Sequence, residues 1–238
     1  MKLDILAISA HPDDIELSCS GTLIAHKTLG YKTGILDLTE GEMSTRGTTE
    51  IRRKESAKAS EIMGLSMRAN LGLPDAKFDL SFENQLRVIK VLRKYRPEIV
   101  LANACYDRHP DHVRAAELIE EAVFKSGLVK IETEDNEGGQ LPWRPKKVYH
   151  YIQSVSLEPD FICDISAQME QKMAAIRVFK SQFFDPESNE FDTYISNPEF
   201  LELIEARSRE WGHRIGVSFG EGFVQRQFLG IKNLFDLV

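Results

Sequence analysis

Short apolar runs alternate with amphipathic stretches through the first half of the chain. The runs are too brief for helices and are bounded by loops, so they predict buried strands at 3–9, 33–39, 68–73 and 98–104. The amphipathic stretches have helical spacing and stop signals, and they predict helices at 16–29, 48–63, 81–96 and 113–126. Strand–helix units in this succession predict parallel strands with right-handed crossovers and helices on both faces. The expected fold is a Rossmann-like three-layer α/β/α sandwich with a mainly parallel sheet.

The second half of the chain is less regular. A polar excursion with Gly and Pro but no core periodicity occupies 132–145. Beyond it the pattern predicts strands at 147–154 and 161–165, helices at 167–182 and 198–211, and a Gly-punctuated tail that ends as strand or loop. Because no internal repeat or linker interrupts the chain, we expect one domain over residues 1–238.

Composition narrows the class of protein. Thirty basic residues stand against 37 acidic ones, and the net charge of −7 argues against non-specific binding to nucleic acid or anionic membranes. No apolar run approaches the ~20 residues of a membrane span, and acidic groups and a His follow the N-terminal apolar stretch where a cleavage site would lie. Cys19, Cys105 and Cys163 are far apart among apolar neighbours, which favours buried free thiols in a cytoplasmic protein.

Two polar motifs follow directly after two of the predicted strands. His11-Pro12-Asp13-Asp14 comes after the strand at 3–9, and His109-Pro110-Asp111-His112 comes after the strand at 98–104. In an open parallel sheet, ligands bind beyond the carboxyl ends of the strands, where the connections diverge. If these two strands are neighbours, the two motifs meet in one crevice.

Imidazoles and carboxylates gathered in this way suit a metal centre. Catalytic zinc takes three protein ligands of these types and lowers the pKa of a bound water to roughly 7. A carboxylate outside the ligand set can accept the water proton, and a second His can protonate a leaving group. Either motif alone is better explained as a turn or a helix cap. Two His and one carboxylate also describe the iron site of non-haem oxygenases, so the metal stays open at this point.

The combination of AHPDDIE (10–16) and HPDH (109–112) resembles the LmbE-like, or PIG-L, superfamily of zinc-dependent N-acetylglucosaminyl deacetylases. The resemblance extends to the GE-x-x-x-x-G loop at 41–47, RRKE at 52–55, LPD at 73–75 and the late GVSFGEGF segment. It is greatest to the deacetylases of bacillithiol biosynthesis, which act on N-acetylglucosaminyl malate.

The resemblance implies a role for each residue of the two motifs. His11, Asp14 and His112 match the zinc ligands, and Asp13 matches the general base. His109 matches the residue that stabilises the tetrahedral intermediate or protonates the leaving amine, and Asp111 matches the carboxylate that orients it. The expected cofactor is Zn²⁺, with Fe²⁺ as the alternative inside the cell.

Further candidates bear on the substrate. Arg53 resembles a family residue that reaches the substrate, and Arg108 is suited to pair bidentately with a carboxylate such as that of malate. Asp75 is a candidate for sugar hydroxyls, and Glu16 for orienting the first helix and the metal loop beside the substrate. Each also has a plain structural explanation as a solvated charge, a turn residue or a cap.

Two tyrosines compete for contact with the oxyanion: Tyr194, in a loop, and Tyr106, next to the second motif. The remaining histidines lie on apolar or helical stretches, and we interpret them as surface or core residues: His26, His150 and His213.

The sequence therefore predicts a zinc-dependent hydrolase that removes the acetyl group from an N-acetylglucosaminyl conjugate, with N-acetylglucosaminyl malate as the first choice. Another N-acetylated amino sugar is the alternative substrate. An iron oxygenase with the same triad and a non-enzymatic sugar-binding module are the rival classes. The expected partner is the small-molecule substrate, without nucleic acid or membrane, and relatives imply a homo-oligomer.

Overall fold

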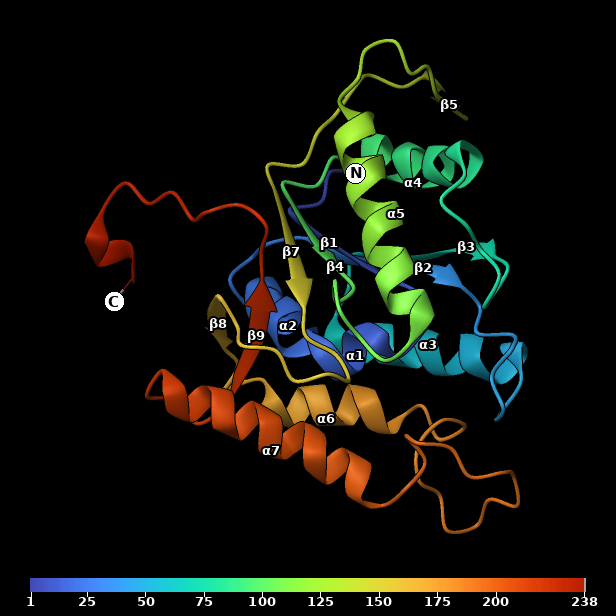
Figure 1. Ribbon diagram of the computed structural model, residues 1–238, viewed down its shortest axis with the longest axis vertical. Coiled ribbons are helices and arrows are strands. Elements are labelled where there is room, and N and C mark those ends of the chain that lie inside the picture. The colour runs from blue at the N-terminus through green and yellow to red at the C-terminus, as the bar shows by residue number, and fades with distance from the viewer. Residues whose placement is uncertain (238) are drawn as a thin grey trace.

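A seven-stranded sheet runs through both halves of the chain in the computed structural model, which describes residues 1–237 (Figure 1). Its strands are β1 (Ile5–Ser9), β2 (Thr33–Thr39), β3 (Met67–Leu73), β4 (Ile99–Ala102), β7 (Lys147–Tyr151), β8 (Phe161–Asp164) and β9 (Gly220–Val224). They lie in the order β3-β2-β1-β4-β7-β9-β8. The first five strands of this order are parallel, and β9 pairs antiparallel with both β7 and β8. The prediction of a mainly parallel sheet is confirmed.

Helices cover both faces of this sheet (Figure 1). One face is covered by α4 (Phe82–Tyr95) and α5 (Pro110–Ser126). The other face carries α1 (Asp14–Ser18), α2 (Ser20–Thr28), α3 (Thr49–Met63), α6 (Met169–Arg177) and α7 (Glu199–Arg214). A short 3₁₀ helix, η1 (Leu234–Leu237), lies in the C-terminal segment, which extends away from the sheet in Figure 1. The three layers of the predicted α/β/α sandwich are therefore present.

Strand β1 is the centre of the hydrophobic core. All five of its residues are buried, and side chains alternate between the faces, as a strand requires. Ile5 and Ala7 pack in the core with α2, α3 and α6, whereas Leu6 and Ile8 pack in the core with α4 and α5. A strand buried on both faces explains why 3–9 is a continuous apolar run.

The order in which strands are added to the sheet reverses between β1 and β4. Ile5 pairs with Ile99 and Ala7 with Leu101, so the two motif-bearing strands are neighbours, as expected. On its other edge β1 pairs with β2, and the chain therefore moves outward from this point in both directions. The crevice for a ligand lies at the carboxyl ends of such a pair.

Several boundaries differ from those predicted. The helix expected at 16–29 is two helices, because the backbone of Cys19 leaves the helical region with φ of −144°. Helix α5 begins at Pro110, since proline at the first helical position fits the helical φ and leaves no N–H unpaired. The HPDH motif thus lies in the first turn of a helix and not in a loop.

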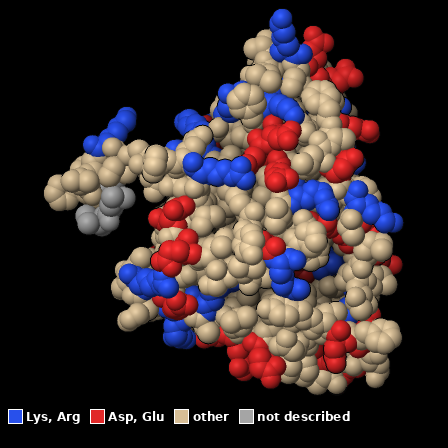
Figure 2. Space-filling view, in the orientation of Figure 1, with Lys and Arg blue, Asp and Glu red and all other residues tan. Residues whose placement is uncertain are grey.

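Lys and Arg are interspersed with Asp and Glu on the face drawn in Figure 2, which shows no basic stripe.

The polar excursion at 132–145 was expected to be irregular, but it contains the small hairpin formed by β5 (Glu134–Asp135) and β6 (Gly138–Gly139). Among the described residues, no helix is both long and apolar enough to cross a bilayer.

Candidate active site

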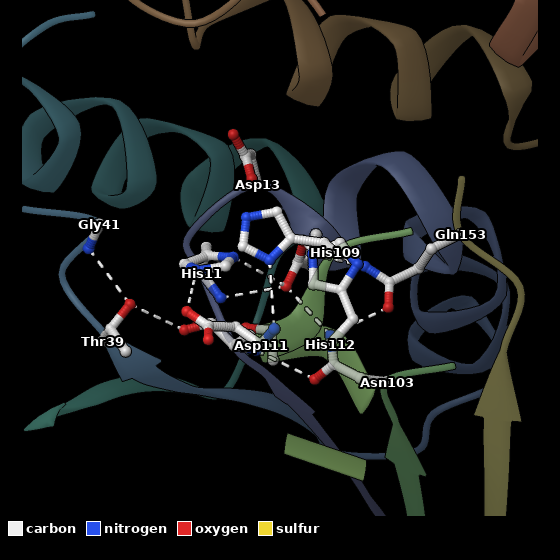
Figure 3. Close-up of polar contacts among 12 residues, drawn as sticks. His11, Asp13, Thr39, Gly41, Asn103, His109, Asp111, His112 and Gln153 are labelled. Carbon is white, nitrogen blue, oxygen red and sulfur yellow. Dashed lines mark hydrogen bonds and ion pairs between the residues drawn. The ribbon is translucent and has the colours of Figure 1, made fainter. Parts of the chain in front are cut away.

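The two motifs meet at the carboxyl ends of β1 and β4 (Figure 3). His11 follows β1, Asp14 is the first residue of α1, and His112 lies in the first turn of α5. The Nε2 atom of His112 is 3.0 Å from Oδ1 of Asp14, and Nδ1 of His11 is 3.8 Å from Oδ2 of the same carboxylate. Three side chains from distant parts of the sequence therefore direct nitrogen and oxygen donors to one point.

A strained turn separates the two aspartates of the first motif. Asp13 has φ of 116°, a conformation that costs a non-glycine residue about 1–3 kcal/mol. The turn sends the Asp13 carboxylate to Arg52, with 2.6 Å between Oδ2 and Nη2. Asp14 points the other way, toward His112, and its Oδ2 accepts the backbone N–H of His11 at 3.0 Å. Adjacent residues thus supply one donor to the metal centre and one carboxylate beside it.

His11 and His112, the two predicted ligand histidines, are each held by a carboxylate behind the ring. Nδ1 of His112 lies 2.9 Å from Asp107, and Nε2 of His11 lies 3.0 Å from Asp75. Carboxylate-backed imidazoles are characteristic of metal sites, because the hydrogen bond fixes which ring nitrogen faces the ion. The donor set left facing the centre is one nitrogen from each His and one carboxylate oxygen. These residues fit a divalent cation with three protein ligands.

The pKa shifts show how negative this centre is. Burial lowers the pKa of His11, but Asp111, Asp75 and Asp14 outweigh it and raise the pKa to about 10. Burial likewise lowers the pKa of His112, whereas Asp14 and Asp107 raise it to about 9. An environment that stabilises protons on imidazoles so strongly also favours a bound cation.

The Asp14 carboxylate is held ionised by His112 and is also contacted by two amide side chains that the sequence did not identify. Burial alone would raise its pKa, but the charge and hydrogen bond of His112 lower it well below the usual range. Amide groups complete its surroundings: Gln153 donates to Oδ1 at 3.1 Å and Asn103 to Oδ2 at 3.1 Å. Asn103 directly follows β4 and Gln153 follows β7 closely, so a polar residue at the carboxyl end of a predicted strand is the signal that could have found them.

Asp13 and Arg52 form a buried ion pair. Burial raises the pKa of the Asp13 carboxyl, and the Arg52 guanidinium opposes that rise. A carboxylate that lies beside the metal centre with its pKa raised is better matched to accepting a proton than an ordinary exposed aspartate. Arg52 holds its orientation.

Sequence reasoning chose Arg53 for the substrate, and the structure corrects this. Arg53 is 65% exposed and forms a bidentate pair with Glu40, at 2.9 and 2.7 Å. Consecutive helical residues point about 100° apart, so only one of the two arginines can face inward. The buried face of α3 contains Arg52, Ser56, Ala59 and Met63. Counting back from the apolar Met63 and Ala59 along that face would have selected Arg52.

Glu16 is also corrected as a substrate-binding residue, whereas the contact of Asp75 with substrate stays a prediction. Glu16 is completely buried against Arg68, 2.6 Å away, and does not line the pocket. Asp75 does line the pocket, but one oxygen accepts from His11 and the other accepts the backbone N–H of Met43 at 3.0 Å. Its carboxylate therefore positions His11, and each oxygen keeps a lone pair with which to accept a sugar hydroxyl.

His109 lies over the two ligand histidines, with ring centroids 4.9 Å from His11 and 4.8 Å from His112 (Figure 3). Burial, His11 and His112 all lower its pKa, so the ring is neutral at pH 7. The predicted role of Asp111 is corrected: its carboxylate contacts His11 and Arg114, and it is the Asp111 backbone N–H that donates to Nδ1 of His109, at 3.3 Å. With Nδ1 accepting, the proton of the neutral ring is on Nε2.

The pocket above this centre has a volume of about 550 Å³. Arg108 and Tyr194 line it together, with the guanidinium carbon 4.1 Å from the ring centroid of the tyrosine. Tyr106 is 64% exposed and does not line the pocket. Of the two tyrosines considered for the oxyanion, the structure places only Tyr194 where a substrate can reach it.

Comparison with known proteins supports the class that this fold and site define. Residues 6–123 match the family model described as PIG-L, GlcNAc-PI de-N-acetylase. The chain is 34% identical over 196 residues to a diacetylchitobiose deacetylase from Thermococcus kodakarensis, covering 75% of this chain and 70% of that protein. It is 28% identical to a "Probable N-acetyl-alpha-D-glucosaminyl L-malate deacetylase 2" from Bacillus anthracis, over 50% of this chain and 58% of the relative.

The whole fold is also matched among solved structures. The conserved protein TT1542 from Thermus thermophilus superposes with a TM-score of 0.86 at 39% identity, covering 97% of this chain and 98% of that one. Fold, centre and relatives together define a metal-dependent amide hydrolase. The chain belongs to the PIG-L family, and it is an N-deacetylase of that family.

Proposed function

We propose that this enzyme removes the N-acetyl group from an N-acetylglucosaminyl conjugate that carries a carboxylate, and that the conjugate is the N-acetylglucosaminyl malate of bacillithiol biosynthesis. The proposed cation is zinc, which suits two imidazoles and one carboxylate as ligands. His11, Asp14 and His112 would hold it. When bound, it supplies a Lewis acid for the acetyl carbonyl and a water of lowered pKa.

Asp13 is the group that accepts the proton of the attacking water. Its carboxylate lies beside the centre without belonging to the ligand set, and its raised pKa favours taking up a proton. Arg52 fixes the carboxylate at 2.6 Å, so that the accepting oxygen does not rotate away. General-base catalysis of this kind contributes typically ~10²–10⁴-fold to the rate.

His109 acts on the opposite side of the reacting carbonyl. As a neutral imidazole with its proton on Nε2, it can donate a hydrogen bond to the tetrahedral oxyanion. The departing amine then needs a proton, either from His109 or from the protonated Asp13. Tyr194, at the mouth of the same pocket, is the second proposed donor to the oxyanion.

The substrate proposal rests on Arg108, which lines the pocket and has no ion-pair partner among the described residues. Three arginines line the pocket, and two are already engaged: Arg52 with Asp13, and Arg207 with the backbone carbonyl of Gln153. Within residues 1–237 Arg108 forms no ion pair, and its guanidinium lies over the ring of Tyr194. A guanidinium in the pocket without an ion-pair partner is available for bidentate pairing with a carboxylate, which malate offers and a neutral sugar lacks.

The test compares two substrates on zinc-loaded enzyme and on the Arg108→Gln variant. We expect N-acetylglucosaminyl malate to be the better substrate, and the variant to lose ~10–100-fold of kcat/KM for it, because a hydrogen-bonded charge pair is worth about 1.5–3 kcal/mol. Hydrolysis of diacetylchitobiose should change less than about twofold in the variant, since that substrate has no carboxylate.

Diacetylchitobiose is also the second candidate substrate, favoured by the relative of 34% identity. A wild-type preference for diacetylchitobiose, unaffected by Arg108→Gln, would replace the malate proposal with this one. No amine release from either substrate by fully metal-loaded enzyme would reject both.

A further inference from the structure

A second group of metal-binding side chains lies apart from the catalytic centre. Cys105 follows β4, Glu120 is in α5 and His150 is in β7, and one donor atom from each falls within 4.8 Å of the others. None of the three lines the active-site pocket. Sequence reasoning interpreted His150 as a core or surface residue, and nothing in the motif pattern linked it to Cys105.

The imidazole of His150 is oriented as a ligand would be. The ring is only 1% exposed, and its Nδ1 lies 2.7 Å from the backbone carbonyl of Asn103. That carbonyl can only accept, so Nδ1 is protonated. Nε2 is directed at Glu120, 2.9 Å away, and donates to it when the ring is charged. A backbone carbonyl behind one ring nitrogen is a common way in which proteins fix a metal-binding histidine.

A positive charge already lies at this point. Nη1 of Arg226, in the segment after β9, is 2.7 Å from Oε2 of Glu120, and its side chain is 59% exposed. Burial lowers the pKa of His150, but hydrogen bonds with Cys105 and Glu120 outweigh it and raise the pKa to about 9. The three donors thus draw in cations, and the exposed arginine can move away without breaking the core.

We propose that Cys105, Glu120 and His150 form a second binding site for a zinc-like divalent cation, which exchanges with the Arg226 guanidinium. Thiolate, imidazole and carboxylate are the three donor types that zinc accepts, and water can complete the tetrahedron. On binding, the Cys105 thiol and the His150 imidazolium each release a proton, and Arg226 moves into solvent still charged.

This site has a direct route to the catalytic centre. The Asn103 residue whose carbonyl holds His150 also donates from its side chain to Asp14, and Cys105 is two residues before Asp107, which holds His112. The proposed second site therefore adjoins the loop that positions the proposed catalytic ligands.

Cobalt distinguishes the two sites, because only one of them contains sulfur. Metal-stripped full-length protein is titrated with Co²⁺, recording bound metal per chain and the thiolate-to-cobalt charge-transfer absorption. We expect two ions per wild-type chain, with the sulfur band present. Cys105→Ser should lose the band and one ion, with affinity at that site lowered more than about 100-fold, because a ligand is lost.

Three further variants make the test specific. Cys163→Ser, which changes another half-buried thiol, should keep the band, and so should His112→Ala, which disables the catalytic centre. Arg226→Gln should bind the second ion roughly two- to fivefold more tightly, since an exposed ion pair worth up to about 1 kcal/mol no longer competes. Circular dichroism confirms that each variant is folded.

The proposal is overturned if folded wild-type protein shows no sulfur band, if Cys163→Ser abolishes it, or if Arg226→Gln fails to tighten binding. The first of these results would leave Glu120, His150 and Arg226 as a purely structural ion-pair cluster.

Discussion

The catalytic centre and the Cys105–Glu120–His150 cluster share one arrangement of side chains but differ in the residues that surround it. Both direct an imidazole nitrogen at a carboxylate, at 3.0 Å in His112–Asp14 and at 2.9 Å in His150–Glu120. Behind His112 stands the ionised Asp107, whereas behind His150 stands the neutral carbonyl of Asn103. A carboxylate makes the imidazole a stronger ligand than a carbonyl does.

The clusters also differ in how their charge is balanced. Around the catalytic centre Asp14, Asp75, Asp107 and Asp111 surround two histidines, and Arg52 is paired with Asp13 outside the ligand set. At the second cluster the guanidinium of Arg226 provides the positive charge that balances Glu120. We therefore expect the proposed cation of the catalytic centre to exchange more slowly than the proposed cation of the second cluster.

The largest effect is expected from Asp13→Asn, which removes the proton acceptor and leaves the ligands of the catalytic centre in place. We expect kcat to fall by ~10²–10⁴-fold while the metal content of the purified protein stays unchanged. Arg53→Gln is the matched control on the exposed side of α3, and it should alter kcat by less than about twofold. An Asp13→Asn variant that retained wild-type turnover would remove Asp13 from the mechanism.

A smaller effect is expected from Asp107→Asn. This changes the residue behind His112, whose carboxylate also accepts backbone N–H groups of His109, Ser154 and Val155. Metal affinity at the catalytic centre should fall by roughly 10–100-fold, because an amide no longer fixes the ring with a full negative charge. The measurement is a competitive titration with a chelator, beside Glu134→Gln as an exposed control. Unchanged affinity would mean that the contrast between carboxylate and carbonyl backing has no energetic consequence.

The smallest effect concerns the second cluster and pH. In metal-stripped protein the pKa of His150 is raised to about 9 from an unfolded value near ~6.5. Its contribution to stability is therefore fully present below about pH 6.5 and is lost as the pH rises through 9. Between pH 6 and 9.5, wild-type protein should lose on the order of 1–2 kcal/mol more unfolding free energy than His150→Gln in urea denaturation. Equal losses in the two proteins would show that the His150–Glu120 contact stabilises nothing.

Much of the fold could be predicted because each strand carries its own signal. Residues 33–39 are a strand with the boundaries expected, and β1 and β4 are neighbours, as the placement of the motifs required. Burial on both faces of a parallel sheet imposes a continuous apolar run, which is visible without any knowledge of partners. Capping and proline rules located most helix ends, although they missed the start of α5.

The sequence by itself determined which residue types follow which strands. The convergence of His11, Asp14 and His112 also required β1 and β4 to be neighbours, which the structure supplies. The position of each motif is set locally, because a motif that directly follows a parallel strand must lie at the carboxyl ends of the strands. Only the tertiary structure decided between Arg52 and Arg53, since the choice depends on the rotation of α3 against the core.

The same holds for the contacts behind the ligands. Asp75 reaches His11 from another loop, whereas Asp107 lies five residues before His112 in the same β4–α5 connection. Cys105, Glu120 and His150 come from a loop, a helix and a strand. Such groupings have no fixed spacing along the chain. They are set by how the helices pack on the sheet, which is a property of the whole fold and not of any segment.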